Sequence, residues 1–201
     1  MIPPLPIAHG TIEGIGDLWN GVLHPLRSPA HLMVLCGLAL VAGQRTKITP
    51  PLIAFLLASA GGIGFSLLGP RLGIPEALPL LPCVLAGLAG VIAAARIPLR
   101  SVALLGLFAA GGFVLGWDSG QDPAEPWVMF KLLLGAWIGL AVALLNFANY
   151  AAMCPKRPWT KIGFRVLGSW VLASSILFLA FTMRVTRPNA APTESAPNQK
   201  G

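Results

Sequence analysis

Long apolar runs alternate along the chain with short breaks of glycine, proline and charge, and this pattern predicts an all-helical membrane protein. Windows of about 20 apolar residues are long enough to cross a bilayer. The expected helices lie at 29–42, 51–68, 79–95, 99–117, 126–150 and 161–183. We therefore expect one polytopic bundle with about six transmembrane helices.

The first expected helix is short for a full crossing, and two prolines stand ahead of it, Pro25 and Pro29. Proline can open a helix but disrupts its interior. We therefore expect the segment around 14–23 to form a separate small helix or loop folded into the membrane face.

Glycines at helical spacing indicate that the bundle is tightly packed. Lipid supplies no hydrophobic force between helices, so close approach depends on small residues. Gly112 and Gly116 form one small-x3-small pair, and Gly135 and Gly139 form another. The five-residue link at 96–100 also predicts that the helices on either side of it are antiparallel neighbours.

Three regions follow from this reading. Residues 1–28 form an extracytoplasmic lead rich in histidine and glycine, 29–183 form the six-helix bundle, and 184–201 form a polar tail expected to be disordered. Residues 1–7 lack the basic start and apolar core of a signal peptide. The chain is therefore expected either to insert without a cleaved signal or to begin close to a processed end.

Composition excludes a soluble globule, because 55% of residues are apolar, only 10% are charged and the mean hydropathy is +0.75. The net charge of +7 is spread over short turns rather than along one stripe, so nucleic acid is not an expected partner. The expected partner is the lipid bilayer.

The placement of basic residues predicts the orientation. One set of loops holds eight basic residues and no acid: Arg45, Lys47, Arg96, Arg100, Lys156, Arg157, Lys161 and Arg165. The other set holds all seven acids: Glu13, Asp17, Glu76, Asp118, Asp122, Glu125 and Glu194. By the positive-inside rule both termini lie outside, in the periplasm if the membrane is the bacterial inner membrane.

All three histidines lie at or before the start of the first expected membrane helix, at His9, His24 and His31. Imidazole suits divalent transition metals, so these residues are candidate ligands for Ni2+, Co2+ or Cu2+. Glu13 and Asp17 are four residues apart and would share a helical face beside the histidines. The alternatives are a structural role for His24, and solvated positions for His9 and the two acids.

Three further polar residues lie within the expected helices. Lys131 is predicted to anchor its helix at the outer interface or to pair with Asp118, Asp122 or Glu125. Asn146 and Asn149 share a helix face, and they either line a transport pathway or form hydrogen bonds between helices.

The segment G-x-x-H-P-L at 21–26, followed by H-L-M at 31–33, resembles the N-terminal signature of the HupE/UreJ family. Ala8, His9 and Gly10 resemble the family's N-terminal histidine element. The resemblance implies six membrane helices, an outward N-terminus and a nickel or cobalt permease linked to hydrogenase and urease maturation. It makes His24 and His31 the chief metal ligands, helped by His9.

The chain also departs from this pattern. Ala30 stands where the family has an aspartate, and 116–120 has no histidine where a second histidine-rich element is expected. These losses motivate an alternative function, a structural or assembly subunit of a larger membrane complex. The expected protein partners are other membrane subunits in that case, and further copies of this chain if it is a permease. No catalytic motif occurs, so an enzyme is not predicted.

Overall fold

The computed structural model describes residues 14–68, 80–120, 125–154 and 157–186, and every regular element in these ranges is an α-helix. The helices are α1 (Asp17–Arg27), α2 (Pro29–Gly43), α3 (Thr49–Leu68), α4 (Leu80–Ala95), α5 (Ser101–Asp118), α6 (Pro126–Met153) and α7 (Pro158–Thr186). The all-helical prediction is confirmed. The six expected helices correspond to α2 to α7. The small helix or loop expected around 14–23 is the helix α1, which begins later than expected and continues through Pro25 to Arg27.

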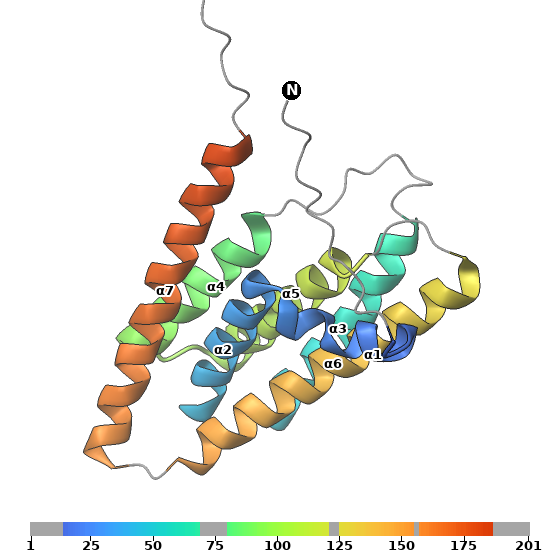
Figure 1. The fold of residues 1–201 in the computed structure, drawn as a ribbon. Helices are drawn as coiled ribbons and strands as arrows, with labels where there is room; N and C mark the ends of the chain where they lie inside the picture. The colour runs from blue at the N-terminus through green and yellow to red at the C-terminus, as the bar shows by residue number, and fades with distance from the viewer. Residues whose placement is uncertain (1–13, 69–79, 121–124, 155–156, 187–201) are drawn as a thin grey trace, which may run out of the picture.

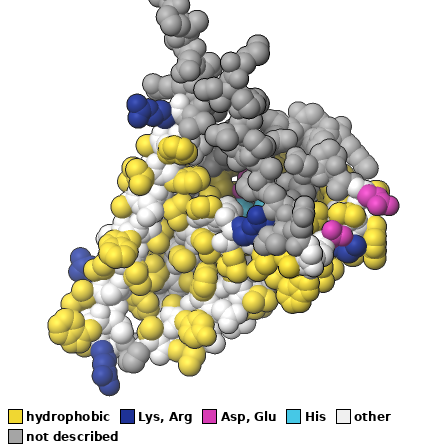
Figure 2. All heavy atoms as spheres, in the orientation of Figure 1, with side chains coloured by type: hydrophobic (Ala, Val, Ile, Leu, Met, Phe, Trp, Pro, Cys, Tyr) yellow, Lys and Arg dark blue, Asp and Glu magenta, His cyan; other side chains and the backbone are white. Residues whose placement is uncertain are grey.

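Four of the described helices, α3, α5, α6 and α7, are long and apolar enough to cross a membrane. α1 and α2 together make a fifth candidate span, bent by 68° at the break between them. α4 is apolar but only 16 residues long. Hydrophobic side chains cover most of the described surface visible in Figure 2. The chain is therefore a multi-pass membrane protein.

α2 is the central helix of the bundle and contacts α1, α4, α5, α6 and α7 (Figure 1). It is apolar on all sides, as expected of a helix surrounded by others, and Val34 and Leu35 are completely buried. Ser28 starts the helix, because its hydroxyl accepts a hydrogen bond from the backbone N–H of His31 at 3.4 Å. Pro29 follows at the first helical position, where its missing N–H costs nothing.

The other helices form three close pairs, α3 with α5, α1 with α6, and α4 with α7. A Cβ atom at Gly112 or Gly116 would collide with the backbone of α3, and one at Gly135 or Gly139 with the backbone of α1. The close packing predicted at both glycine spacings is confirmed. The backbones approach so closely that only hydrogen fits in place of a side chain.

The helices at 79–95 and 99–117 were expected to be antiparallel neighbours, and they are in contact, although neither has the other as its main packing partner. α4 and α5 touch, but α4 packs mainly along α7 and α5 along α3. Gly90 of α4 and Gly168 of α7 each face the backbone of the other helix. This close contact makes α7, rather than α5, the main packing partner of α4 despite the short link between α4 and α5.

The two ends of the chain lie largely outside the described residues. α7 continues to Thr186, three residues past the expected end of the bundle at 183. The disorder expected for the tail concerns 187–201, which the structure does not describe, and the same holds for residues 1–13 of the lead.

The glycine contacts give a matched pair of substitutions on one helix. Gly116→Ala is expected to destabilise the protein by about 1–3 kcal/mol, because the new methyl group meets the backbone at Ser59. Gly106→Ala on the same helix has open space around the new methyl group, and it is expected to be neutral or to stabilise by roughly 0.5–1 kcal/mol. Unfolding of the detergent-solubilised protein measures both. Equal effects of the two substitutions would contradict the close α3–α5 contact.

Candidate functional site

The two ends of the bundle differ in charge. All three described acids, Asp17, Asp118 and Glu125, lie at one end, which we call the acidic end. Arg45 and Arg100 lie at the other, which we call the basic end. α5 begins after Arg100 and ends with Asp118, and its 18 residues separate the ends by about 27 Å.

His31 occupies the first turn of α2 at the acidic end, and its side chain is completely buried. Its Nε2 lies 2.8 Å from Oδ2 of Asp118, the last residue of α5. The Asp118 side chain is 28% exposed, so the contact joins a buried ring to a carboxylate that reaches solvent. A buried polar ring needs a hydrogen-bonding partner, and this one also fastens α2 to the end of α5.

The hydrogen bond determines which nitrogen of His31 is available. An ionised carboxylate only accepts hydrogen bonds, so Nε2 carries the proton that it donates to Asp118. Nδ1 is then left with a lone pair, and it is buried with no hydrogen-bond partner among the described residues. Histidines that bind metals commonly donate the other ring N–H to a carboxylate, which orients the ring and makes the free nitrogen more basic.

His24 lies in the last turn of α1, with its ring centre 5.3 Å from that of His31 and the rings at 75°. The two residues are seven apart, and the prolines left their geometry open from sequence alone. The structure shows that the 68° bend between α1 and α2 brings the rings together. Nε2 of His24 is also buried.

The spacing of the two rings suits a shared ion. With metal–nitrogen bonds of about 2 Å, two imidazoles on one tetrahedral ion have ring centres about 5 Å apart. The described part of the chain contains no group of three or more His, Cys, Asp or Glu residues placed to hold a metal. His9 and Glu13, the other expected ligands, lie outside the described residues.

Asp17, the remaining expected ligand, is engaged by Lys131. The Lys131 ammonium lies 2.8 Å from the Asp17 carboxylate and 5.9 Å from the ring centre of Trp127. Lys131 was expected to anchor its helix at the outer interface or to pair with Asp118, Asp122 or Glu125. In the structure Lys131 pairs with Asp17 instead. The close contacts at Gly135 and Gly139 place α1 beside the first turns of α6, and this brings the two side chains together. Both side chains are about one-third exposed, so the pair is worth at most about 1 kcal/mol.

Asn146 and Asn149 are exposed on the surface of α6. The Asn146 amide donates a hydrogen bond to the Val142 carbonyl of its own helix at 2.7 Å. The pathway and interhelical roles expected for these residues stay predictions.

Asp118 is the site residue whose role the sequence analysis missed. It was counted as one of the seven acids of the outer loops and as one of three candidate partners of Lys131, yet it contacts His31 from 87 residues away. Two signals pointed to it: it ends an apolar helix, and Ala30 leaves this chain without an aspartate next to His31. Neither signal identifies which helix end meets α2.

Removing the Asp118 carboxylate is expected to destabilise the fold. Asp118→Ala leaves the Nε2 proton of His31 buried without its acceptor, which costs about 1–3 kcal/mol. Asp118→Asn keeps an acceptor oxygen and is expected to recover most of that loss. Glu125→Gln serves as the control. Glu125 is an acid at the same end, and its side chain makes no hydrogen bond to the N-terminus of α6. Thermal unfolding compares the variants, and an Asp118→Ala effect no larger than the control's would argue against a structural hydrogen bond.

Comparison with known protein families gives a match over most of the chain. The family model described as HupE / UreJ protein matches residues 1–178. No curated protein and no solved structure matches the chain. The matched region spans the histidine segment and six of the seven described helices completely, together with most of α7. The chain therefore belongs to the HupE/UreJ family.

Proposed function

We propose that this protein takes up a divalent transition metal ion, Ni2+, Co2+ or Cu2+, at the acidic end of the bundle and moves it across the membrane. The HupE/UreJ family is associated with accessory nickel and cobalt permease function, and it is a transporter-like rather than a catalytic family. The metal is the cargo. His24 and His31 are its proposed first ligands.

The observation that carries this proposal is the arrangement of His31 between Asp118 and His24. Asp118 holds one nitrogen of His31, and the ring of His24 lies beside it at 5.3 Å. Imidazole nitrogens are good ligands for Ni2+, Co2+ and Cu2+, and two of them preoriented on separate helices reduce the ordering cost of binding. The remaining coordination positions would be filled by water or by His9 and Glu13.

Asp17 has a different role in this proposal. Its ion pair with Lys131 fastens α1 to α6, and this contact helps to keep His24 beside His31. The carboxylate that supports the site is therefore Asp118, which replaces the aspartate absent at position 30.

The charges of the two ends suggest the direction of uptake. By the positive-inside rule the basic end faces the cytoplasm, which places the acidic end and both termini in the periplasm of a bacterial inner membrane. Acidic side chains around the entrance raise the local concentration of cations.

A second candidate function, a structural or assembly subunit, is supported by α7. This helix has 29 residues, and only 11% of the residues in its most apolar 18-residue stretch are buried within the protein. Its exposed apolar face meets either lipid or a partner helix. Migration of the gently extracted protein together with other proteins on native gels would favour the subunit.

Metal binding is tested by isothermal titration of the purified protein with Ni2+, Co2+ and Cu2+. His24→Ala and His31→Ala are each expected to weaken binding at least tenfold, and the double variant to abolish it. Asn146→Ala with Asn149→Ala removes two exposed polar side chains far from the site and is expected to leave binding unchanged. Unfolding curves confirm that the variants fold. Unchanged affinity in a folded double histidine variant would overturn the proposal.

Asp118 gives a separate prediction. Asp118→Asn is expected to weaken metal binding by about 10–100-fold, because loss of an orienting carboxylate typically has that effect on a ligating histidine. Asp17→Asn is expected to change the affinity much less, because its carboxylate is held by Lys131. The same titrations measure both, and the opposite ranking would contradict the orienting role of Asp118.

A further inference from the structure

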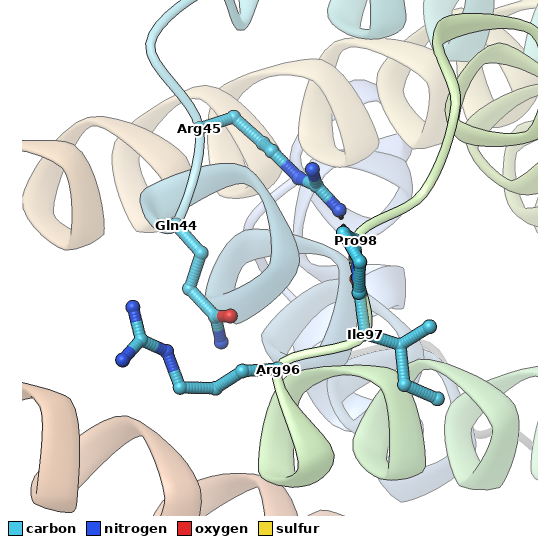
Figure 3. A pocket seen from close by; sticks show the side chains of 5 residues that line it. All are labelled: Gln44, Arg45, Arg96, Ile97 and Pro98. Carbon is cyan, nitrogen blue, oxygen red and sulfur yellow. Dashed lines mark hydrogen bonds between the residues drawn. The ribbon is translucent and has the colours of Figure 1, made fainter.

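An open cleft of about 310 Å³ lies at the basic end, away from the histidines. It is lined by Gln44, Arg45, Arg96, Ile97 and Pro98, so it lies between the end of α2 and the link from α4 to α5 (Figure 3). Nothing in the metal-uptake proposal uses these residues.

The walls of the cleft are fixed by hydrogen bonds to backbone carbonyls. The Arg45 guanidinium donates to the carbonyls of Ile97 at 3.0 Å and Leu99 at 3.5 Å. The Gln44 amide donates to the carbonyl of Ala93 at 2.9 Å. Nε of Arg45 is buried with no hydrogen-bond partner in the described part of the chain. One donor of an otherwise fixed guanidinium is therefore unsatisfied beside the cleft.

Arg96 has a backbone conformation that its side chain does not favour. Its φ is +54°, and the N–H of Ile97 bonds to the carbonyl of Ile92 at 3.1 Å, which closes the end of α4. Glycine is the preferred residue at this left-handed position after a helix. An arginine there is less favourable for the fold, and such residues often persist for function. Figure 3 shows the Arg96 guanidinium extended beside Gln44.

No acid neutralises this charge among the described residues, because all three lie at the acidic end. A third guanidinium is close to the cleft, since Arg165 of α7 donates to the carbonyl of Ala94 at 3.2 Å. Three arginines therefore converge on the end of α4.

We propose that this cleft binds the phosphate group of an anionic phospholipid. Guanidinium groups match phosphate with paired hydrogen bonds, and basic pockets between membrane helices are typical sites for anionic headgroups. The cleft lies at the helix ends, where headgroups lie in the bilayer. Ile97 is 40% exposed and forms an apolar rim with Pro98, which suits a lipid better than a hydrated ion.

The test is native mass spectrometry of the full-length protein from mixed phosphatidylglycerol and phosphatidylcholine nanodiscs. The wild type is expected to retain phosphatidylglycerol preferentially, and Arg96→Gly to reduce this retention at least fivefold. Glycine suits the left-handed position, so this variant is expected to unfold at the same temperature as the wild type or higher. Lys47→Gln removes one exposed positive charge from the same end and is expected to keep the retention.

Two results would overturn the proposal. Equal retention of phosphatidylglycerol in the wild type and Arg96→Gly, or equal losses in Arg96→Gly and Lys47→Gln, would mean that the cleft is not the lipid site. Titration of delipidated protein with inorganic phosphate distinguishes a lipid phosphate from a free phosphate ion as the ligand of the cleft. Millimolar phosphate that binds in an Arg96-dependent way, without selective lipid retention, would assign the cleft to a free anion instead.

Discussion

The hydrogen bond between His31 and Asp118 is the interaction on which the arrangement of the acidic end depends. Its two residues come from the start of the central helix and the end of α5, and the imidazole is completely buried. A polar ring at that depth is tolerated only with a partner, so the bond sets the position of α2 relative to α5. The same bond leaves Nδ1 of His31 buried without a hydrogen-bond partner among the described residues.

The second histidine depends on a different constraint, the close backbone contacts at glycines. Gly135 and Gly139 let α1 lie against α6, and the break at Ser28 then turns the chain into α2. With larger residues at these positions α1 would be displaced, and His24 would move away from His31. The two glycines, whose role is packing alone, therefore determine the geometry of the two histidines that are proposed to bind the metal ion.

Apolar runs and breakers predicted α2 to α7 to within a few residues. The prolines before α2 predicted a separate small helix or loop around 14–23, but α1 continues through Pro25 to Arg27, so Pro25 does not end it. The glycine spacings predicted close contacts, but not which helices make them. Asp118 as the partner of His31 and Asp17 as the partner of Lys131 could not be predicted, because each pair joins residues far apart in sequence. Such pairings are decided by helix packing, which no local pattern in one sequence encodes.

The two ends of the bundle thus have different chemistry, with histidine and carboxylate at one end and, at the other, arginines that no described acid neutralises. X-ray absorption of the Ni2+-loaded protein measures which groups surround the ion. If His24 and His31 bind nickel, the spectrum shows scattering from two imidazole rings, and this scattering is lost in the His24→Ala, His31→Ala double variant. A nickel shell without imidazole, or one unchanged in that variant, would contradict the proposed metal site.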